Sequence, residues 1–158
     1  ARIVMCERVL CALLLLTAAA LSVHAQTPVE DVITKYEDVK GARCFVADGP
    51  RMVFARSLLK RTQVAPIAPD VDKLAVLKME DAPQHSRSMF DSDLDDALKK
   101  YDHYGKHDSK NGTVDIYILH GSGDSVKELV IFNPSIWSLN SLYGNFTVHQ
   151  LLELDSEK

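Results

Sequence analysis

The close spacing of turn signals in the last third of the chain constrains the fold more than any other feature. The segments "SKNG", "GSGD" and "PS" separate four strand-like runs at about residues 102–108, 113–120, 126–133 and 136–143. Links this short join antiparallel neighbours, because a parallel pair needs a much longer crossover connection. We therefore predict a four-strand antiparallel meander at the end of the domain.

The segments before the meander alternate between helix and strand patterns. "TPVEDVITKYEDVKG" begins with Thr27 as N-cap, followed by a proline at the first helical position and a glutamate that completes a capping box. The same reasoning predicts further helices over 48–62, 86–101 and after Thr147, strands over 42–47 and 73–81, and an extended linker over 63–72. The order predicts one α+β domain over residues 26–158, with helices packed on one face of a mixed or antiparallel sheet.

Residues 1–25 have the pattern of a secretory signal peptide. Arg8 precedes the apolar run Val9–Leu21, which is too short to span a bilayer, and Val23–Ala25 suits the peptidase cleavage site. We expect cleavage before Gln26, with two earlier alternatives at Ala20 and Ser22. The domain would then act in the periplasm or outside the cell, with no transmembrane segment left after cleavage.

Charge limits the kinds of partner that the exported domain can bind, and its cysteine content limits the disulfides that it can form. The chain has a formal net charge of −4, so its overall charge disfavours nucleic acid and anionic lipid. Cys6 and Cys11 lie too early in the apolar run to be lipidated. Cys44 is then the only cysteine left after cleavage, and no internal disulfide is possible. Its apolar context, "RCFVA", predicts a buried structural thiol.

Three of the six histidines lie around the Asn111-Gly112 turn. A two-residue turn there would pair His103 with His120 and place both on the same face as His107. A zinc site needs three or four ligands around one ion, and residues four apart on a strand are about 13 Å apart. Only His103 and His120 could share an ion, and a third ligand would have to come from elsewhere.

Other catalytic patterns are weaker still. No serine occupies a GxSxG elbow, and "GSGDS" lies between antiparallel strands with no helix behind it. The acidic run "DSDLDDALKKYD" lacks the glycine and the downstream glutamate of a calcium loop. The sequence therefore assigns no catalytic residue and no cofactor, and an enzyme is the less favoured class.

Aromatic and apolar side chains concentrate between residues 132 and 146. Strand alternation places Trp137, Leu139 and Tyr143 on one face of the sheet. A small domain uses most of its aromatic residues in the core. An exposed patch formed by Phe132, Trp137 and Tyr143 would instead mark a binding surface.

Three segments resemble a family of small exported proteins from Bacteroides-type gut bacteria, known only as a domain of unknown function. They are "VITKYEDVKGARCFVA", "KNGTVDIYIL" and "KELVIFNPSIWSLNSLYGNFTVHQLLEL", and the resemblance spans Val32 to Leu154. Members of that family are often lipoproteins, from which this chain departs because it lacks a lipobox. The resemblance implies a fold and no catalytic residue.

These observations predict an exported, non-catalytic envelope or interaction module. Its partner would be an envelope protein or an apolar ligand. The alternative is a metal-dependent or hydrolytic enzyme that uses His103 and His120.

Overall fold

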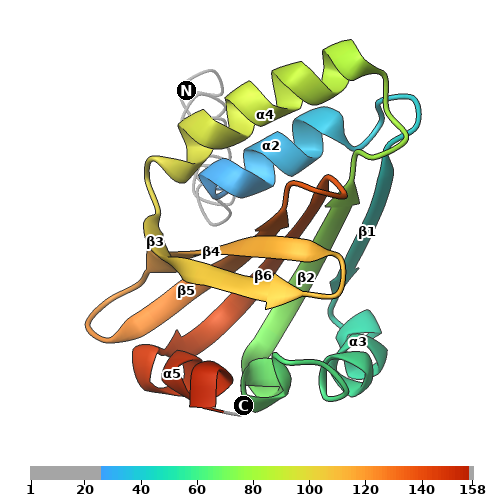
Figure 1. Cartoon of the computed structure of the whole chain (residues 1–158). Coiled ribbons are helices and arrows are strands. Elements are labelled where there is room, and N and C mark those ends of the chain that lie inside the picture. The colour runs from blue at the N-terminus through green and yellow to red at the C-terminus, as the bar shows by residue number, and fades with distance from the viewer. Residues whose placement is uncertain (1–25, 157–158) are drawn as a thin grey trace, which may run out of the picture.

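The computed structural model describes residues 26–156, so the expected signal peptide over 1–25 lies outside the described residues. The described chain forms a six-stranded sheet in the order β1-β2-β6-β5-β4-β3, and every neighbouring pair is antiparallel (Figure 1). The strands are β1 (Arg43–Asp48), β2 (Val71–Lys78), β3 (Asp102–Ser109), β4 (Gly112–His120), β5 (Ser125–Asn133) and β6 (Ser138–Thr147). The helices are α2 (Pro28–Tyr36), α3 (Arg51–Leu59), the 3-10 helix η1 (Ala65–Asp70), α4 (Gln84–Leu98) and α5 (Val148–Ser156).

The α+β class, the four-strand meander and the terminal helix are confirmed. Strands β3 to β6 follow one another in space as they do in sequence. The N-caps predicted from sequence form: Thr27 Oγ1 accepts a hydrogen bond from the Glu30 amide, and Thr147 Oγ1 accepts one from the Gln150 amide. The Glu30 side chain, which was expected to complete the capping box at Thr27, pairs with Lys73. The Gln150 side chain in turn accepts from the Thr147 amide at 2.9 Å, which completes a reciprocal box at the start of α5.

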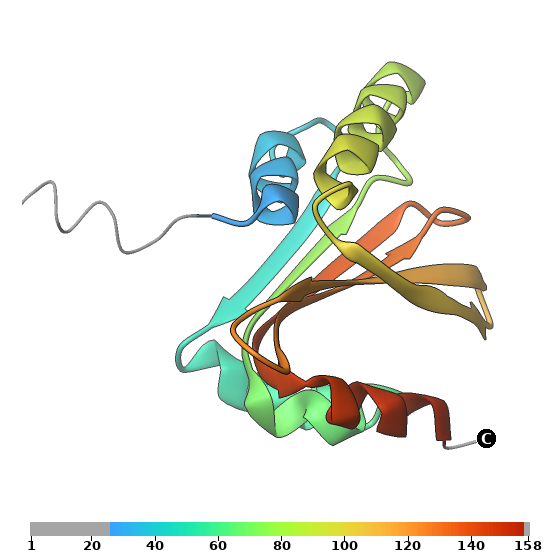
Figure 2. The same ribbon diagram turned by 90° about the vertical axis from the view of Figure 1, so that its left-hand side faces the viewer.

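The helices lie on both faces of the sheet, whereas the sequence pattern predicted one face. Helices α2 and α4 cover what we call the upper face, and α3, η1 and α5 lie against the lower face (Figure 2). The reason is in the central strands, which are apolar on both sides. In β5, Val130 and Phe132 point into the upper core while Leu129 points into the lower one.

Two further expectations are wrong. The linker predicted as extended over 63–72 contains η1, with Pro66 in its first turn. Cys44 is exposed, because β1 is an edge strand and most of its side chains face solvent. Partial burial, together with the nearby carboxylates of Glu37 and Asp38, raises the pKa of the Cys44 thiol, which makes a nucleophilic role unfavourable.

Phe90 is the centre of the upper core. It is fully buried, and its ring contacts those of Tyr36, Phe132 and Trp137 at centroid distances of 5.4, 6.1 and 6.3 Å. Its side chain therefore joins α4 to α2 and to the sheet.

We expect Phe90→Ala to lower the free energy of unfolding by about 3–5 kcal/mol, since it removes a large buried ring and leaves a cavity. Phe54, which is 66% exposed on α3, provides the matched control, and Phe54→Ala should change stability by less than about 0.5 kcal/mol. Urea unfolding of both variants measures the difference. Equal effects would show that the upper core does not hold the fold together.

Candidate binding groove

The lower face of the sheet is only partly covered, and the uncovered part forms a groove. One section of it has a volume of about 500 Å³ and lies between the residues after α3 and the β3–β4 turn. A narrower section of about 60 Å³ continues between the β3–β4 hairpin and α5. The two sections are adjacent, because both are lined by Gln63, Val64 and Ile131, and we call them together the groove.

The groove has an apolar floor and a polar rim. Its floor comes from strands β2, β4, β5 and β6 and includes the half-buried side chains of Val76, Ile116 and Ile131. Polar side chains stand at the wide section, namely Thr62, Gln63, Ser109, Lys110, Asn111 and Asn140. This combination of an apolar bed with a few polar groups is typical of small-molecule sites.

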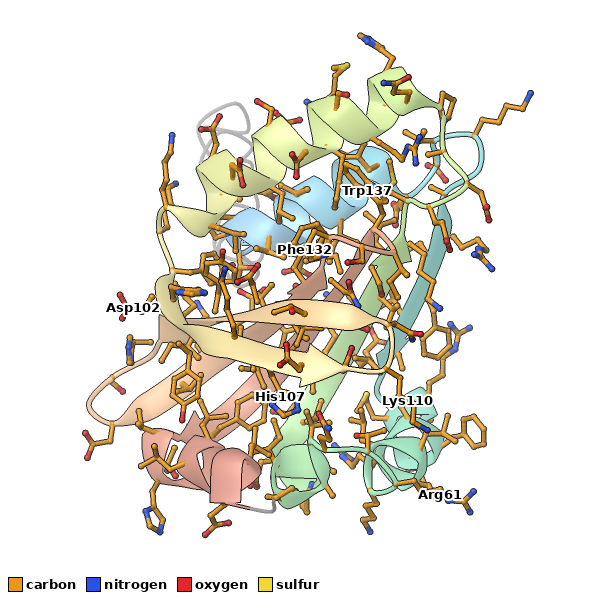
Figure 3. The ribbon with its side chains drawn as sticks, viewed as in Figure 1. Arg61, Asp102, His107, Lys110, Phe132 and Trp137 are labelled. Atoms are coloured by element: carbon orange, nitrogen blue, oxygen red, sulfur yellow. The ribbon has the colours of Figure 1, made fainter. Side chains whose placement is uncertain are left out.

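His107 lines the narrow section among mostly apolar residues. It lies opposite Val114 in the β3–β4 ladder (Figure 3). Leu151 and Leu154 of α5 line the same narrow section. The His107 Nε2 atom is shielded from solvent and has no hydrogen-bond partner within the described part of the chain. A buried polar atom without a partner is costly, so a ligand that bonded to Nε2 would remove that cost.

The histidine register differs from the sequence prediction. The turn is Lys110-Asn111, with Ser109 opposite Gly112, and an irregularity between His103 and Gly105 shifts the pairing. As a result His103 lies opposite Tyr117, at a ring distance of 4.9 Å, and not opposite His120. A bulge adds one residue and reverses the facing of everything beyond it, so His103 and His107 lie on opposite faces.

Each of the two proposed metal-binding histidines has its own carboxylate. His103 Nε2 lies 3.2 Å from Asp115, and His120 Nε2 lies 2.7 Å from Asp102. Among residues 26–156, no group of three or more His, Cys, Asp or Glu side chains is arranged to hold a metal ion. The alternative of a metal-dependent or hydrolytic enzyme therefore gains no support from the geometry.

The three aromatic residues proposed for binding lie on the upper face, away from the groove (Figure 3). Phe132 belongs to the buried core, while Trp137 and Tyr143 are partly buried against it. Trp137 adopts a positive φ of 51° in the β5–β6 turn, and the Arg87 guanidinium lies 5.5 Å from its ring centroid. A binding role for Phe132, Trp137 and Tyr143 stays a prediction.

A buried polar cluster lies beneath α2, on the upper face of the sheet. Glu128 is fully buried in β5, where it accepts hydrogen bonds from Tyr101 (2.5 Å) and Ser141 (2.6 Å). The Tyr101 hydroxyl also accepts a bond from the Val29 amide in the first turn of α2. The cluster therefore ties α2 and the end of α4 to the centre of the sheet.

Burial dominates the electrostatics of this cluster. It raises the pKa of Glu128 above its ordinary value, although the hydrogen bonds from Ser141 and Tyr101 act in the opposite direction. The pKa values of Tyr101 and Tyr143 are also raised, first by burial and then by the charge of Glu128. With no exposed surface, Glu128 has no access to a solute, so its role is to hold the fold.

Sequence reasoning missed both the groove and Glu128. A signal for Glu128 was present in "VKELVIFN", where a charged residue stands at an inward position of an otherwise apolar strand. The groove left no such signal, because its floor residues read as ordinary core positions.

Comparisons with models of known families, with curated proteins and with solved structures find no match for this chain. Within the described residues, no helix is long and apolar enough to cross a membrane.

Glu128 makes stability depend on pH in a direction that can be measured. A carboxyl whose pKa is raised on folding contributes stability below its unfolded value of 4.5 and loses that contribution as pH rises through the folded value. We expect the stability of Glu128→Gln relative to the wild type to increase between pH 4 and pH 7, because glutamine stays neutral. Urea unfolding at several pH values measures this slope.

The control is Glu80→Gln, which makes the same substitution at an exposed acid in the turn after β2. A relative stability of Glu128→Gln that fell with rising pH would mean that the buried carboxyl is held as the anion.

Proposed function

We propose that this chain is an exported, non-catalytic binding module that holds a small amphipathic molecule in the groove. The single observation that carries the proposal is an apolar groove in which His107 Nε2 is buried without a hydrogen-bond partner among residues 26–156. The apolar part of the ligand would lie over Ile116 and Ile131, and a polar group would bond to His107.

The dimensions favour a small molecule over a folded protein partner. A volume of about 500 Å³ falls in the range of small-molecule sites, which is about 300–1,000 Å³. The rim supplies Lys110 and Asn111 beside the wide section, and both suit a polar or anionic head group. An elongated ligand with an apolar body, one polar group toward His107 and another toward Lys110 matches this distribution.

Export and the resemblance to small exported proteins of Bacteroides-type bacteria support the same proposal. An extracytoplasmic protein meets detached amphiphiles at a membrane surface, and a groove of this kind shields their apolar part from water. Catalysis is not part of the proposal, because His103 and His120, the two histidines considered for it, pair with separate carboxylates.

The test uses N-phenyl-1-naphthylamine, an apolar probe whose fluorescence rises when it leaves water. We expect saturable binding to the wild type and at least about tenfold weaker binding to Ile131→Lys, since a lysine would occupy the floor and place a charge against an apolar ligand. Val114→Trp, which fills the narrow section without adding charge, should weaken binding as well. Fluorescence titration, with thermal unfolding of each variant, gives both affinity and fold.

Ile136→Lys is the matched control, because Ile136 is also partly exposed but lies in the β5–β6 turn and does not line the groove. It should bind the probe as the wild type does. Unchanged binding by Ile131→Lys, combined with loss of binding by Trp137→Ser, would place the site on the upper face and contradict the proposal.

A further inference from the structure

Helix α3 is apolar on two opposite sides, although the protein covers only one of them. Met52 and Ala55 are buried against the lower core. On the opposite side Val53, Phe54 and Leu58 are 70%, 66% and 48% exposed. An exposed group of large apolar side chains is typical of an interaction surface, and within the described residues no part of the protein covers this side of α3.

Cations flank this exposed side. At about 100° per residue, Val53, Phe54 and Leu58 share one side of the helix, with Arg51 next to one margin and Lys60 next to the other. Arg61 follows directly after the helix and lies at its lower edge (Figure 3). We call Arg51, Val53, Phe54, Leu58, Lys60 and Arg61 the α3 patch.

The charge of this region is opposite to that of the whole protein. Residues 49–69 contain four basic residues and no aspartate or glutamate, in a chain whose net charge is −4. Arg56 makes intramolecular contacts: it donates a hydrogen bond to the Val71 carbonyl at 2.9 Å and forms an ion pair with Asp72. Arg51, Lys60 and Arg61 are exposed and take part in no ion pair within the described residues, so their charge is available to a partner.

We propose that the α3 patch docks the protein onto the surface of an anionic lipid bilayer. A helix lying in the interface buries its apolar side among the upper acyl chains while lysine and arginine at its margins reach the head groups. Each of these cations adds attraction to an anionic surface. The local charge of α3 thus reverses the expectation drawn from the net charge, which disfavoured anionic lipid.

A flotation assay with unilamellar vesicles tests the proposal on the purified exported protein. We expect binding to vesicles of phosphatidylcholine with 30% phosphatidylglycerol, weak binding to phosphatidylcholine alone, and release at 0.5 M salt, because salt screens the attraction. The triple variant R51Q/K60Q/R61Q should bind about a hundredfold more weakly, at about fivefold per cation. Phe54→Ser should weaken binding while leaving stability unchanged.

Matched controls come from exposed residues elsewhere on the surface. Met89→Ser on α4 and Leu152→Ser on α5 remove apolar side chains that are 45% and 54% exposed, and K99Q/K100Q removes two cations after α4. All three should bind vesicles as the wild type does. Equal binding by Phe54→Ser, or no binding by the wild type, would overturn the proposal.

Self-association is the competing outcome, and sedimentation velocity detects it. A wild-type dimer that Phe54→Ser converts to a monomer, without vesicle binding, would assign the patch to a second copy of the chain and overturn membrane docking. A monomer that floats with anionic vesicles supports it.

Discussion

The two central strands, β5 and β6, carry apolar side chains on both faces, and the rest of the architecture follows from that arrangement. Leu129 and Val130 are neighbours in sequence, yet they belong to opposite cores. A sheet that is apolar on both sides must be covered on both sides. Helices α2 and α4 cover the upper face, whereas α3, η1 and α5 leave part of the lower face bare. The groove is thus the part of the lower face that these helices do not cover. Its floor is apolar because it is made of the same inward-facing strand positions as the lower core.

The upper layer is held by a polar contact as well as by packing. Glu128 receives hydrogen bonds from Tyr101 and Ser141, and Tyr101 accepts one from the α2 backbone. The ion pair between Glu30 and Lys73 adds a second link from α2 to the sheet, this time to β2. A buried carboxyl rarely adds net stability compared with a well-packed apolar group, but it does fix the position of its partners. The cluster therefore specifies where α2 sits over the sheet.

Local signals could be read from the sequence, while features that depend on neighbours could not. The turns between β3 and β6 and the caps at Thr27 and Thr147 rest on contacts within a few residues, and all of them form. The exposure of Cys44 depends on β1 being an edge strand, which no residue within β1 encodes. The irregularity before Gly105 could not be read from the sequence either. A single extra residue in β3 there places His103 on the other face of the sheet. The groove was missed because it exists only where the helices leave part of the lower face of the sheet uncovered, and no single residue indicates that gap.

The α3 patch and the groove are adjacent in the chain. The α3 patch ends at Arg61, and the next two residues, Thr62 and Gln63, line the wide section of the groove. Leu59, which lies between Leu58 and Lys60 of the patch, also lines that section. A helix that lay on a bilayer through Phe54 would hold the segment 59–63 close to the head groups. The wide section is also the one whose lining includes the polar side chains of Lys110 and Asn111. Binding and docking have separate residues and separate tests, yet the short connection between them gives one geometry in which a membrane-derived ligand enters the groove.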